Sequence, residues 1–288
     1  MASLTSGDLL LPKNVHFISG LPRSGSTLLA AILAQNPRFW AGMTGPVGSL
    51  TNRLLEGMSH DETAVFISAE QKRTLLMGLF AAYYREQIEQ QKIIFDTNRL
   101  WCSKLSLIGE LFPRAKVISC VRNVAWVMDS LERLFRNNAF DISGLFNNRQ
   151  EAATVYSRTE TLAQGNRLVG FAYNALREAY YAPDAARMLL VEYDLLVQQP
   201  QATLALIYQF LEEPHFEHDF EQIEYDAAVF DRQLRTQGLH ALRPKVEFKP
   251  RQTLLPPDLF EKYSQLSFWS DPKNTLAHVI CAAADRVA

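Results

Sequence analysis

The stretch that decides the fold is residues 16–29, HFISGLPRSGSTLL. Gly20 and Gly25 are separated by four residues, as in the phosphate-binding pattern G-x-x-x-x-G-K-[ST]. Ser26 occupies the position of the lysine in that pattern, and the nearest cation is Arg23, inside the loop. The stretch therefore predicts a phosphate-binding turn that lacks the lysine of nucleotide-hydrolysing enzymes.

The residues around this loop predict a strand, a glycine-rich turn and a helix. Residues 15–19 form a short apolar run, and residues 27–35 are apolar nearly all round until Pro37. Backbone N–H groups at the start of such a helix form a cradle for an anion. The loop adds one cation and three hydroxyls, from Arg23, Ser24, Ser26 and Thr27. The alternative is a tight turn that binds no ligand.

The rest of the chain alternates between strand and helix patterns. Short apolar runs at 93–97, 115–121 and 188–193 predict three further strands. Helices are expected between them, at 70–91, up to Pro113, at 124–135 and at 200–213, with a largely helical region at 150–182. This alternation predicts an α/β fold, with a central parallel sheet flanked by helices. We expect a single domain over 1–288, with an N-terminal tail at 1–13 and an irregular segment at 214–288 before a final helix.

Composition limits the functional classes. The chain has 288 residues, 48% hydrophobic and 21% charged, as in a soluble globular protein. The net charge of −2 gives no reason to expect nucleic acid or an anionic membrane as a partner. Cys102, Cys120 and Cys281 are widely spaced, which predicts reduced thiols and a cytoplasmic protein. We find no signal peptide and no apolar run long enough to span a membrane.

A second motif follows the predicted strand at 115–121. Within CVRNVAWVMDSLERLF (120–135), Arg122 stands at the strand's end and Ser130 follows eight residues later, beside the inward face of the predicted helix. Taken with the glycine-rich loop, this pair predicts a second phosphate site. Because the lysine is absent and Asp96 is the only acid that clearly ends a predicted strand, we expect both anions to be held without a metal.

Two separated phosphate motifs resemble those of the sulfotransferases that use 3′-phosphoadenosine-5′-phosphosulfate (PAPS). LPRSGSTLL is similar to their 5′-phosphosulfate loop, and VRNVAWVMDS is similar to their 3′-phosphate motif. The segment LLVEYDLLVQQPQATLALIYQFLEEP (189–214) resembles a strand-to-helix segment of the same family. The resemblance implies a P-loop-like sulfotransferase fold that binds PAPS through Arg23, Ser24, Gly25, Ser26 and Thr27 at the 5′ end, Arg122 and Ser130 at the 3′-phosphate, and Tyr193 near the adenine or the 3′ site.

The family also closes its cofactor site with a basic segment near the C-terminus. The equivalent here is TQGLHALRPKVEFKP (236–250), within the irregular segment 214–288. The resemblance implies cofactor contacts from Gly238, Leu239, His240, Arg243 or Lys245. A solvated basic turn is the alternative for each of them.

The reaction that the resemblance implies is an in-line transfer of a sulfuryl group, in which Arg23 neutralises charge and a general base takes the acceptor proton. The base motifs of known branches are absent: FDTNRLW (95–101) stands where small-molecule sulfotransferases carry a K-T-H motif. Asp96, beside Arg99, is the first candidate for the base, and Glu56 and His60 follow. The alternative for Asp96 is a carboxylate that caps a helix or structures a loop.

The acceptor is open at this stage. PRSGSTLL and LFPRAKVISCVRN (111–123) are nearest to the tyrosylprotein sulfotransferase branch, which implies a tyrosyl hydroxyl. A bacterial member without a signal peptide could equally sulfate a carbohydrate, a lipid or a small metabolite, and a homodimer is compatible with either. Two other functions compete: a small-molecule or nucleotide kinase, and a catalytically inactive PAPS-binding protein.

Overall fold

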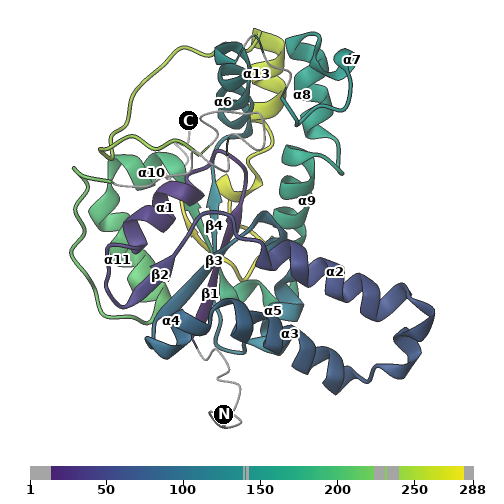
Figure 1. The fold of residues 1–288 in the computed structure, drawn as a ribbon. Helices are drawn as coiled ribbons and strands as arrows, with labels where there is room; N and C mark the ends of the chain where they lie inside the picture. Colours follow the sequence, from purple (N-terminus) through teal and green to yellow (C-terminus); the bar gives the residue numbers. More distant parts are fainter. Residues whose placement is uncertain (1–13, 139, 141–142, 224–230, 232–239, 282–288) are drawn as a thin grey trace.

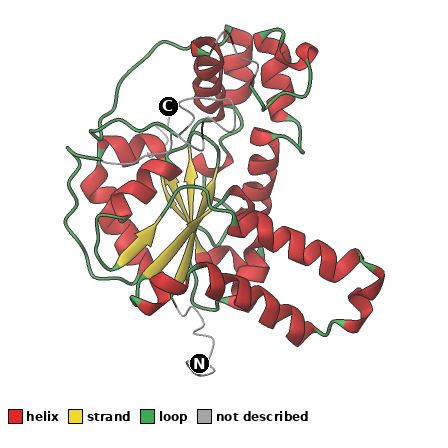
Figure 2. Ribbon diagram, in the orientation of Figure 1, coloured by secondary structure: helices red, strands yellow, loops and turns green. Residues whose placement is uncertain are grey.

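A computed structural model describes residues 14–138, 140, 143–223, 231 and 240–281. In this part of the chain six strands form one parallel sheet in the order β2-β3-β1-β4-β5-β6 (Figures 1 and 2). The strands are β1 (Val15–Gly20), β2 (Phe39–Ala41), β3 (Ile93–Thr97), β4 (Val117–Val121), β5 (Met188–Glu192) and β6 (His278–Ile280). The predicted α/β fold with a central parallel sheet flanked by helices is confirmed.

Helices connect the strands and cover both faces of the sheet, with η marking a short 3-10 helix. In chain order they are α1 (Ser26–Leu33), α2 (Val47–His60), η1 (Glu62–Phe66), α3 (Ala69–Tyr83), α4 (Arg85–Glu89), η2 (Arg99–Lys104), α5 (Leu105–Leu111), α6 (Val124–Asn137), α7 (Arg149–Ala152), α8 (Val155–Ala163), α9 (Leu168–Tyr180), η3 (Pro183–Arg187), α10 (Tyr193–Gln198), α11 (Pro200–Leu211), α13 (Pro257–Ser264) and η4 (Phe268–Ser270).

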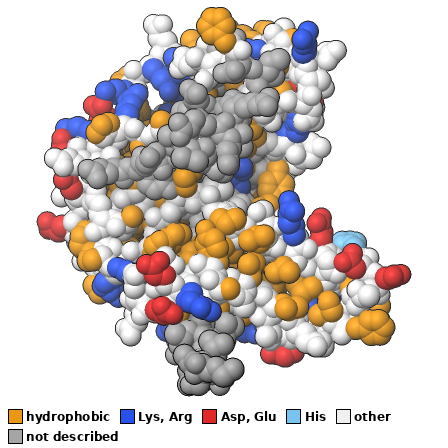
Figure 3. Space-filling model, in the orientation of Figure 1, with side chains coloured by type: hydrophobic (Ala, Val, Ile, Leu, Met, Phe, Trp, Pro, Cys, Tyr) orange, Lys and Arg blue, Asp and Glu red, His pale blue; other side chains and the backbone are white. Residues whose placement is uncertain are grey.

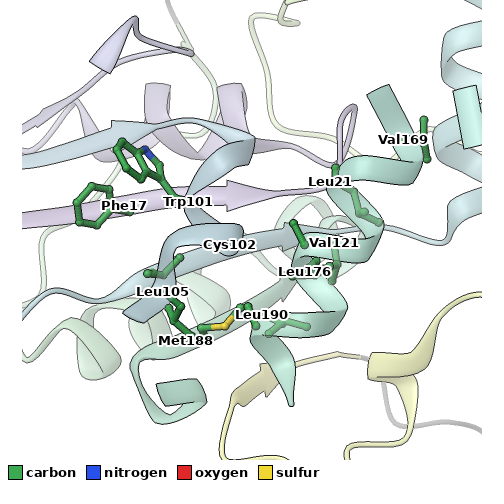
Figure 4. Close-up of a cluster of buried hydrophobic side chains, with 14 of the residues drawn as sticks. Phe17, Leu21, Trp101, Cys102, Leu105, Val121, Val169, Leu176, Met188 and Leu190 are labelled. Carbon is green, nitrogen blue, oxygen red and sulfur yellow. The ribbon is translucent and has the colours of Figure 1, made fainter. Parts of the chain in front are cut away.

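Alternating side chains on the strands divide the core into two layers. In β1, Phe17 faces one layer and Ile18 faces the other. The Ile18 layer packs against α1, α10 and α11. The Phe17 layer packs against η2, α5, α6 and α9. Figure 4 shows part of the Phe17 layer, where the rings of Phe17 and Trp101 lie 4.7 Å apart between centroids.

The structure differs from the sequence-based expectation in several elements. Helix α2 and the following α3 form an arm that projects from the body of the molecule, and α2 was not expected (Figure 1). The single helix expected at 70–91 is two helices, α3 and α4, because the helical conformation is interrupted at Tyr84. Strands β2 and β6 were also missed. Each has three residues, which is too short for a periodic pattern to show.

The parallel sheet places the functional motifs at one edge. Strands β1, β3, β4 and β5 all run in the same direction, so the segments that follow them emerge side by side. Those segments hold the glycine-rich loop, Thr97–Arg99, Arg122 and Tyr193. Open α/β sheets bind ligands at this carboxyl edge, so the fold itself brings the predicted motifs together.

Candidate active site

Three residues of the glycine-rich loop have backbone angles in the left-handed region: Gly20 (φ 106°), Arg23 (φ 58°) and Gly25 (φ 97°). A Cβ atom at Gly20 would lie 2.1 Å from the carbonyl oxygen of Cys120, and one at Gly25 would lie 2.8 Å from Cδ2 of Tyr193. Only glycine meets both demands, since it tolerates a positive φ and needs no room for a side chain. The loop is thereby pressed against β4 and the start of α10.

The hydroxyls of the loop divide between two roles. Ser24 is buried, and its one hydroxyl proton is shared between the carbonyls of Leu21 and Cys120, the latter 2.7 Å from Oγ. It does not line the cavity above the loop, whereas Ser26 and Thr27 do. The Ser24 hydroxyl therefore ties the loop to β4, and its contact with a 5′ anion stays a prediction.

The two phosphate motifs meet in space. Nε of Arg23, in the loop, donates a hydrogen bond of 3.1 Å to Oγ of Ser130, on α6. Arg122 lines the same cavity, and its guanidinium lies 4.2 Å above the ring of Tyr193. The sequence predicted each motif separately, and the fold joins them in one cavity.

The charge of Arg122 is only weakly compensated by neighbouring residues. Its Nε is buried and has no hydrogen-bond partner among the described residues, and its nearest carboxylate oxygen, on Asp194, is 4.0 Å from Nη2. Burial lowers the pKa of Arg122, while Tyr193 and Asp194 act in the opposite direction. A buried cation with a free donor is stabilised by an anion that accepts from it.

The C-terminal segment forms the roof of the cavity. Asp129, on α6, accepts hydrogen bonds from the backbone N–H of Leu254 at 2.7 Å and from the Thr253 hydroxyl at 3.2 Å. Nη2 of Arg251 lies 2.8 Å from the same carboxylate, and Arg251 lines the cavity. Sequence reasoning missed Arg251 because the basic segment was ended at Pro250, although Arg251 is simply its next cation.

Of the other residues that the sequence predicted in this segment, some line the cavity and others lie outside the described residues. His240, Arg243 and Lys245 line the cavity. Lys245 also forms an ion pair of 2.5 Å with Glu221, so its charge is already partly neutralised by a protein carboxylate. Gly238 and Leu239 lie outside the described residues.

Cations dominate the cavity. Among the described residues that line it, Glu247 is the only acid, against seven basic residues: Arg23, Arg99, Arg122, Arg243, Lys245, Lys249 and Arg251. Burial lowers the pKa of Arg23 and of Arg99, and for Arg23 the nearby Tyr193 and Asp231 act in the opposite direction. The overall charge of −2 therefore conceals a local site suited to a polyanion.

Asp96 lies near the end of β3, as expected, but it is not part of the cavity. Its side chain is 1% exposed and does not line the cavity. It accepts hydrogen bonds from the Tyr84 hydroxyl and, at 2.6 Å, from Nε1 of Trp101. Among the described residues, no ion pair joins it to Arg99. Burial raises the pKa of Asp96 against the effect of both hydrogen bonds, so the alternative role, a carboxylate that structures the loop, fits better.

The two other candidate bases lie on the projecting arm. Glu56 and His60 are exposed on α2, and neither lines the cavity. His240 does line it, and its Nδ1 lies 2.6 Å from Oδ1 of the buried Asp231. If Nδ1 donates to the carboxylate, Nε2 is the nitrogen that accepts a proton. The sequence analysis had assigned His240 only to cofactor binding, because nothing in the sequence showed its pairing with Asp231.

The described residues contain no group of three or more His, Cys, Asp or Glu side chains placed to hold a metal ion. In the same part of the chain, no helix combines the length and the apolar character required to cross a bilayer.

Comparison with known proteins agrees with the geometry. The model of a family described as the Sulfotransferase family matches residues 16–218. The chain belongs to this family. Membership supports sulfuryl transfer as its general activity and classes it as a transferase. No match was found among curated protein sequences.

The solved structure of one sulfotransferase domain shares the fold, and two further sulfotransferase structures are less similar. The sulfotransferase domain from the curacin biosynthetic pathway is 20% identical, with a TM-score of 0.57, over 89% of this chain and 98% of that one. The sulfotransferase domain from the olefin synthase of Synechococcus PCC 7002 is 20% identical, with a TM-score of 0.48, over 88% and 94%. A sulfotransferase from Alicyclobacillus acidocaldarius is 13% identical, with a TM-score of 0.47, over 87% and 89%.

Proposed function

We propose that this sulfotransferase moves the sulfuryl group of PAPS to a hydroxyl acceptor by in-line transfer. The observation that carries the proposal is the hydrogen bond between Arg23 and Ser130. It joins a loop suited to a 5′ anion to a motif suited to a 3′ phosphate, inside one cationic cavity. PAPS carries two such anionic groups on one nucleoside, and the orphaned donor of Arg122 supports this fit.

Each end of PAPS has residues to hold it. Ser26, Thr27 and the loop around Gly25 would hold the 5′-phosphosulfate at the start of α1. Arg122, Ser130 and Arg251 would hold the 3′-phosphate. Tyr193 would lie beside the 3′ site, under Arg122. When bound, PAPS supplies an activated sulfuryl group on a good leaving group, so the protein has to position it and offset its charge.

The chain's own residues supply the remaining chemistry. Arg23 lines the cavity and would neutralise negative charge that develops on the leaving phosphate. We assign the general base to His240, with Asp231 fixing its tautomer, in place of Asp96. Thr97 and Arg99 line the cavity after β3, and Oγ1 of Thr97 is buried without a partner among the described residues. Both would donate to oxygens of the group in transfer.

Two other functions are less well supported. A kinase would need a cation at position 26 and acids for magnesium, but the lining holds Ser26 and, in its described part, Glu247 as its one acid. A PAPS-binding protein without activity would need no base, and the pairing of His240 with Asp231 favours an enzyme. The scattered cysteines, of which Cys102 and Cys120 are buried, fit a reducing compartment, so we place the activity in the cytoplasm.

The experiment that tests the proposal is turnover of PAPS labelled in its sulfuryl group, with a panel of hydroxyl compounds. Arg23→Ala is expected to lower turnover by about 10²–10³-fold, the range for loss of one preorganised donor. Binding of adenosine 3′,5′-bisphosphate should weaken less, since the loop and Arg122 remain. Full turnover with poor affinity would reduce Arg23 to a binding residue, and no transfer to any acceptor would favour the inactive alternative.

A further inference from the structure

A groove adjoins the donor cavity on the side of the projecting arm. It lies between the start of α2, at Pro46 and Ser49, and the start of α9, at Leu168 and Phe171. Figure 3 shows the surface hollowed between the α2–α3 arm and the helices above it. Four residues line both spaces: Thr44, Asn98, Arg99 and Leu168. The groove therefore leads directly into the site proposed for the sulfuryl group.

The surface of the groove is mostly apolar, and its described lining carries no acid. Its apolar surface comes from five residues: Gly45, Pro46, Leu100, Leu168 and Phe171. Its two cations differ in their pairing. Arg167 is bound by Glu151, whereas no hydrogen bond or ion pair joins the side chain of Arg99 to the described residues. Arg99 thus stands at the inner end of a mostly apolar groove as a cation without a partner among the described residues.

Hydrogen bonds fix the floor and the α2 wall of the groove. The side chain of Asn98 donates to the carbonyl of Gly45 at 3.2 Å and accepts from the backbone N–H of Leu100 at 3.1 Å. At Gly48 a Cβ would lie 2.7 Å from Nδ2 of Asn98, so the helix can approach this closely only with glycine there. These contacts occupy the side-chain amide of Asn98, so it has little hydrogen-bonding capacity left for a polar ligand. The groove therefore selects its ligand mainly through shape and apolar surface.

We propose that this groove binds the acceptor, and that the acceptor is a hydroxyl compound with an apolar body and no positive charge. The inference rests on the proposed function. The hydroxyl would lie at the inner end, beside Arg99, and the apolar body would lie along Leu168 and Phe171. Arg99 would hold the negative oxygens of the sulfate ester that forms, and would repel an acceptor that carries an ammonium group.

Alkyl sulfates test this directly, because they are product analogues with a sulfate head and an apolar chain. Butyl, hexyl and octyl sulfate are titrated by calorimetry into protein saturated with adenosine 3′,5′-bisphosphate, and into protein alone. Affinity should rise by about two- to fourfold for each added methylene, where fourfold corresponds to its full burial. Hexylammonium chloride should show no binding. Failure of the bisphosphate to bind would count against the proposed function, whereas the titrations into protein alone would still assess the groove.

Charges of opposite sign, introduced at the rim of the groove, supply a matched set of variants. Ser49 is exposed on the first turn of α2, where an acid is tolerated at a helix start. Ser49→Asp should weaken hexyl sulfate by about three- to tenfold, and Ser49→Lys should strengthen it, with bisphosphate affinity unchanged in both. Ser59→Asp is the control, because it lies about 15 Å further along the same helix, beyond the screening length.

Three results would overturn the proposal. The first is an affinity for alkyl sulfates that does not depend on chain length. The second is equal loss in Ser49→Asp and Ser59→Asp. The third is a short tyrosine peptide that binds more tightly than octyl sulfate, which would assign the groove to a polypeptide.

Discussion

Buried guanidinium groups define the site at the scale of single residues. Arg23, Arg99 and Arg122 all line the cavity, and burial lowers the pKa of each. An arginine stays charged in a protein, so the cost of desolvation persists until an anion arrives. The free energy of ligand binding therefore includes relief of a cost already present in the empty site.

Arg122 offers the sharpest residue-level prediction. Arg122→Ala should weaken adenosine 3′,5′-bisphosphate by about ten- to a hundredfold, since a hydrogen bond to a charged group contributes about 1.5–3 kcal/mol. Adenosine 5′-phosphate, which lacks the 3′ group, should lose much less. Calorimetry with both nucleotides measures the difference, and equal losses would remove Arg122 from the 3′ site.

If His240 is the base, kcat/KM should depend on pH. Burial lowers the pKa of His240 from its ordinary value of 6.5, and the hydrogen bond and charge of Asp231 oppose that shift. A base must be neutral to accept a proton, so kcat/KM should fall as the pH falls through this lowered pKa, and the acid limb should lie below 6.5. His240→Asn should reduce turnover by about 10²–10⁴-fold.

The variant Asp231→Asn tests whether His240 acts as a base or has only a structural role. Without the carboxylate, the pKa of His240 loses what raises it, so the acid limb should move to lower pH. The measurement is the pH profile of kcat/KM for the variant and the wild type. A profile that does not move would show that His240 is not the titrating group.

The sequence predicted some of these residues and not others, for a physical reason. Arg122 and Ser130 are eight residues apart on one strand end and one helix, so their relation is local and visible. Asp96 looked equally well placed, at the carboxyl end of β3. Its role was decided by Tyr84 and Trp101, whose rings lie against it only in the folded chain. The pairing of His240 with Asp231 likewise depends on tertiary structure.

At the scale of elements, α6 connects the two halves of the proposed cofactor site. Ser130 faces the loop of β1 and bonds to Arg23, whereas the preceding residue, Asp129, holds the C-terminal segment. Because adjacent residues on this helix serve both sides, binding at the 3′ position is expected to depend on the segment's attachment.

Asp129→Ala tests that dependence. It leaves the N–H of Leu254 and the hydroxyl of Thr253 without their acceptor, at a cost of about 1–3 kcal/mol for each unsatisfied buried group. We expect faster amide hydrogen exchange at Leu254 and weaker binding of adenosine 3′,5′-bisphosphate. Arg136→Ala is the control, because Arg136 lies on the same helix and bonds to Glu132, not to the C-terminal segment. The prediction is wrong if both variants behave alike.

The elements themselves were predictable in proportion to their length and burial. Strands β1, β3, β4 and β5 were expected because they are continuous apolar runs between glycine, proline or polar residues. Helix α2 was missed because it belongs to a projecting arm, and its few buried residues, such as Val47 and Met58, do not mark a continuous apolar face.

At the scale of the whole molecule, the cavity is assembled from segments far apart in the sequence. The loop after β1, the ends of β3 and β4, the start of α10 and residues 240–251 all line it. A ligand that contacts all of them binds the folded chain and not the unfolded one. It should therefore stabilise the fold as a unit.

Adenosine 3′,5′-bisphosphate at about 100 times its dissociation constant should raise the free energy of unfolding by about 2.7 kcal/mol. For a chain of this size, that corresponds to a rise of several degrees in Tm. The rise should persist in EDTA, since the residues proposed to hold both phosphates are cations and hydroxyls. ATP should give a smaller rise with or without magnesium, because it has no 3′-phosphate for Arg122. A scanning fluorimetry series with the two nucleotides, each with magnesium and with EDTA, measures all four conditions. Stabilisation by ATP that requires magnesium and exceeds that of the bisphosphate would contradict the sulfotransferase proposal and favour a kinase.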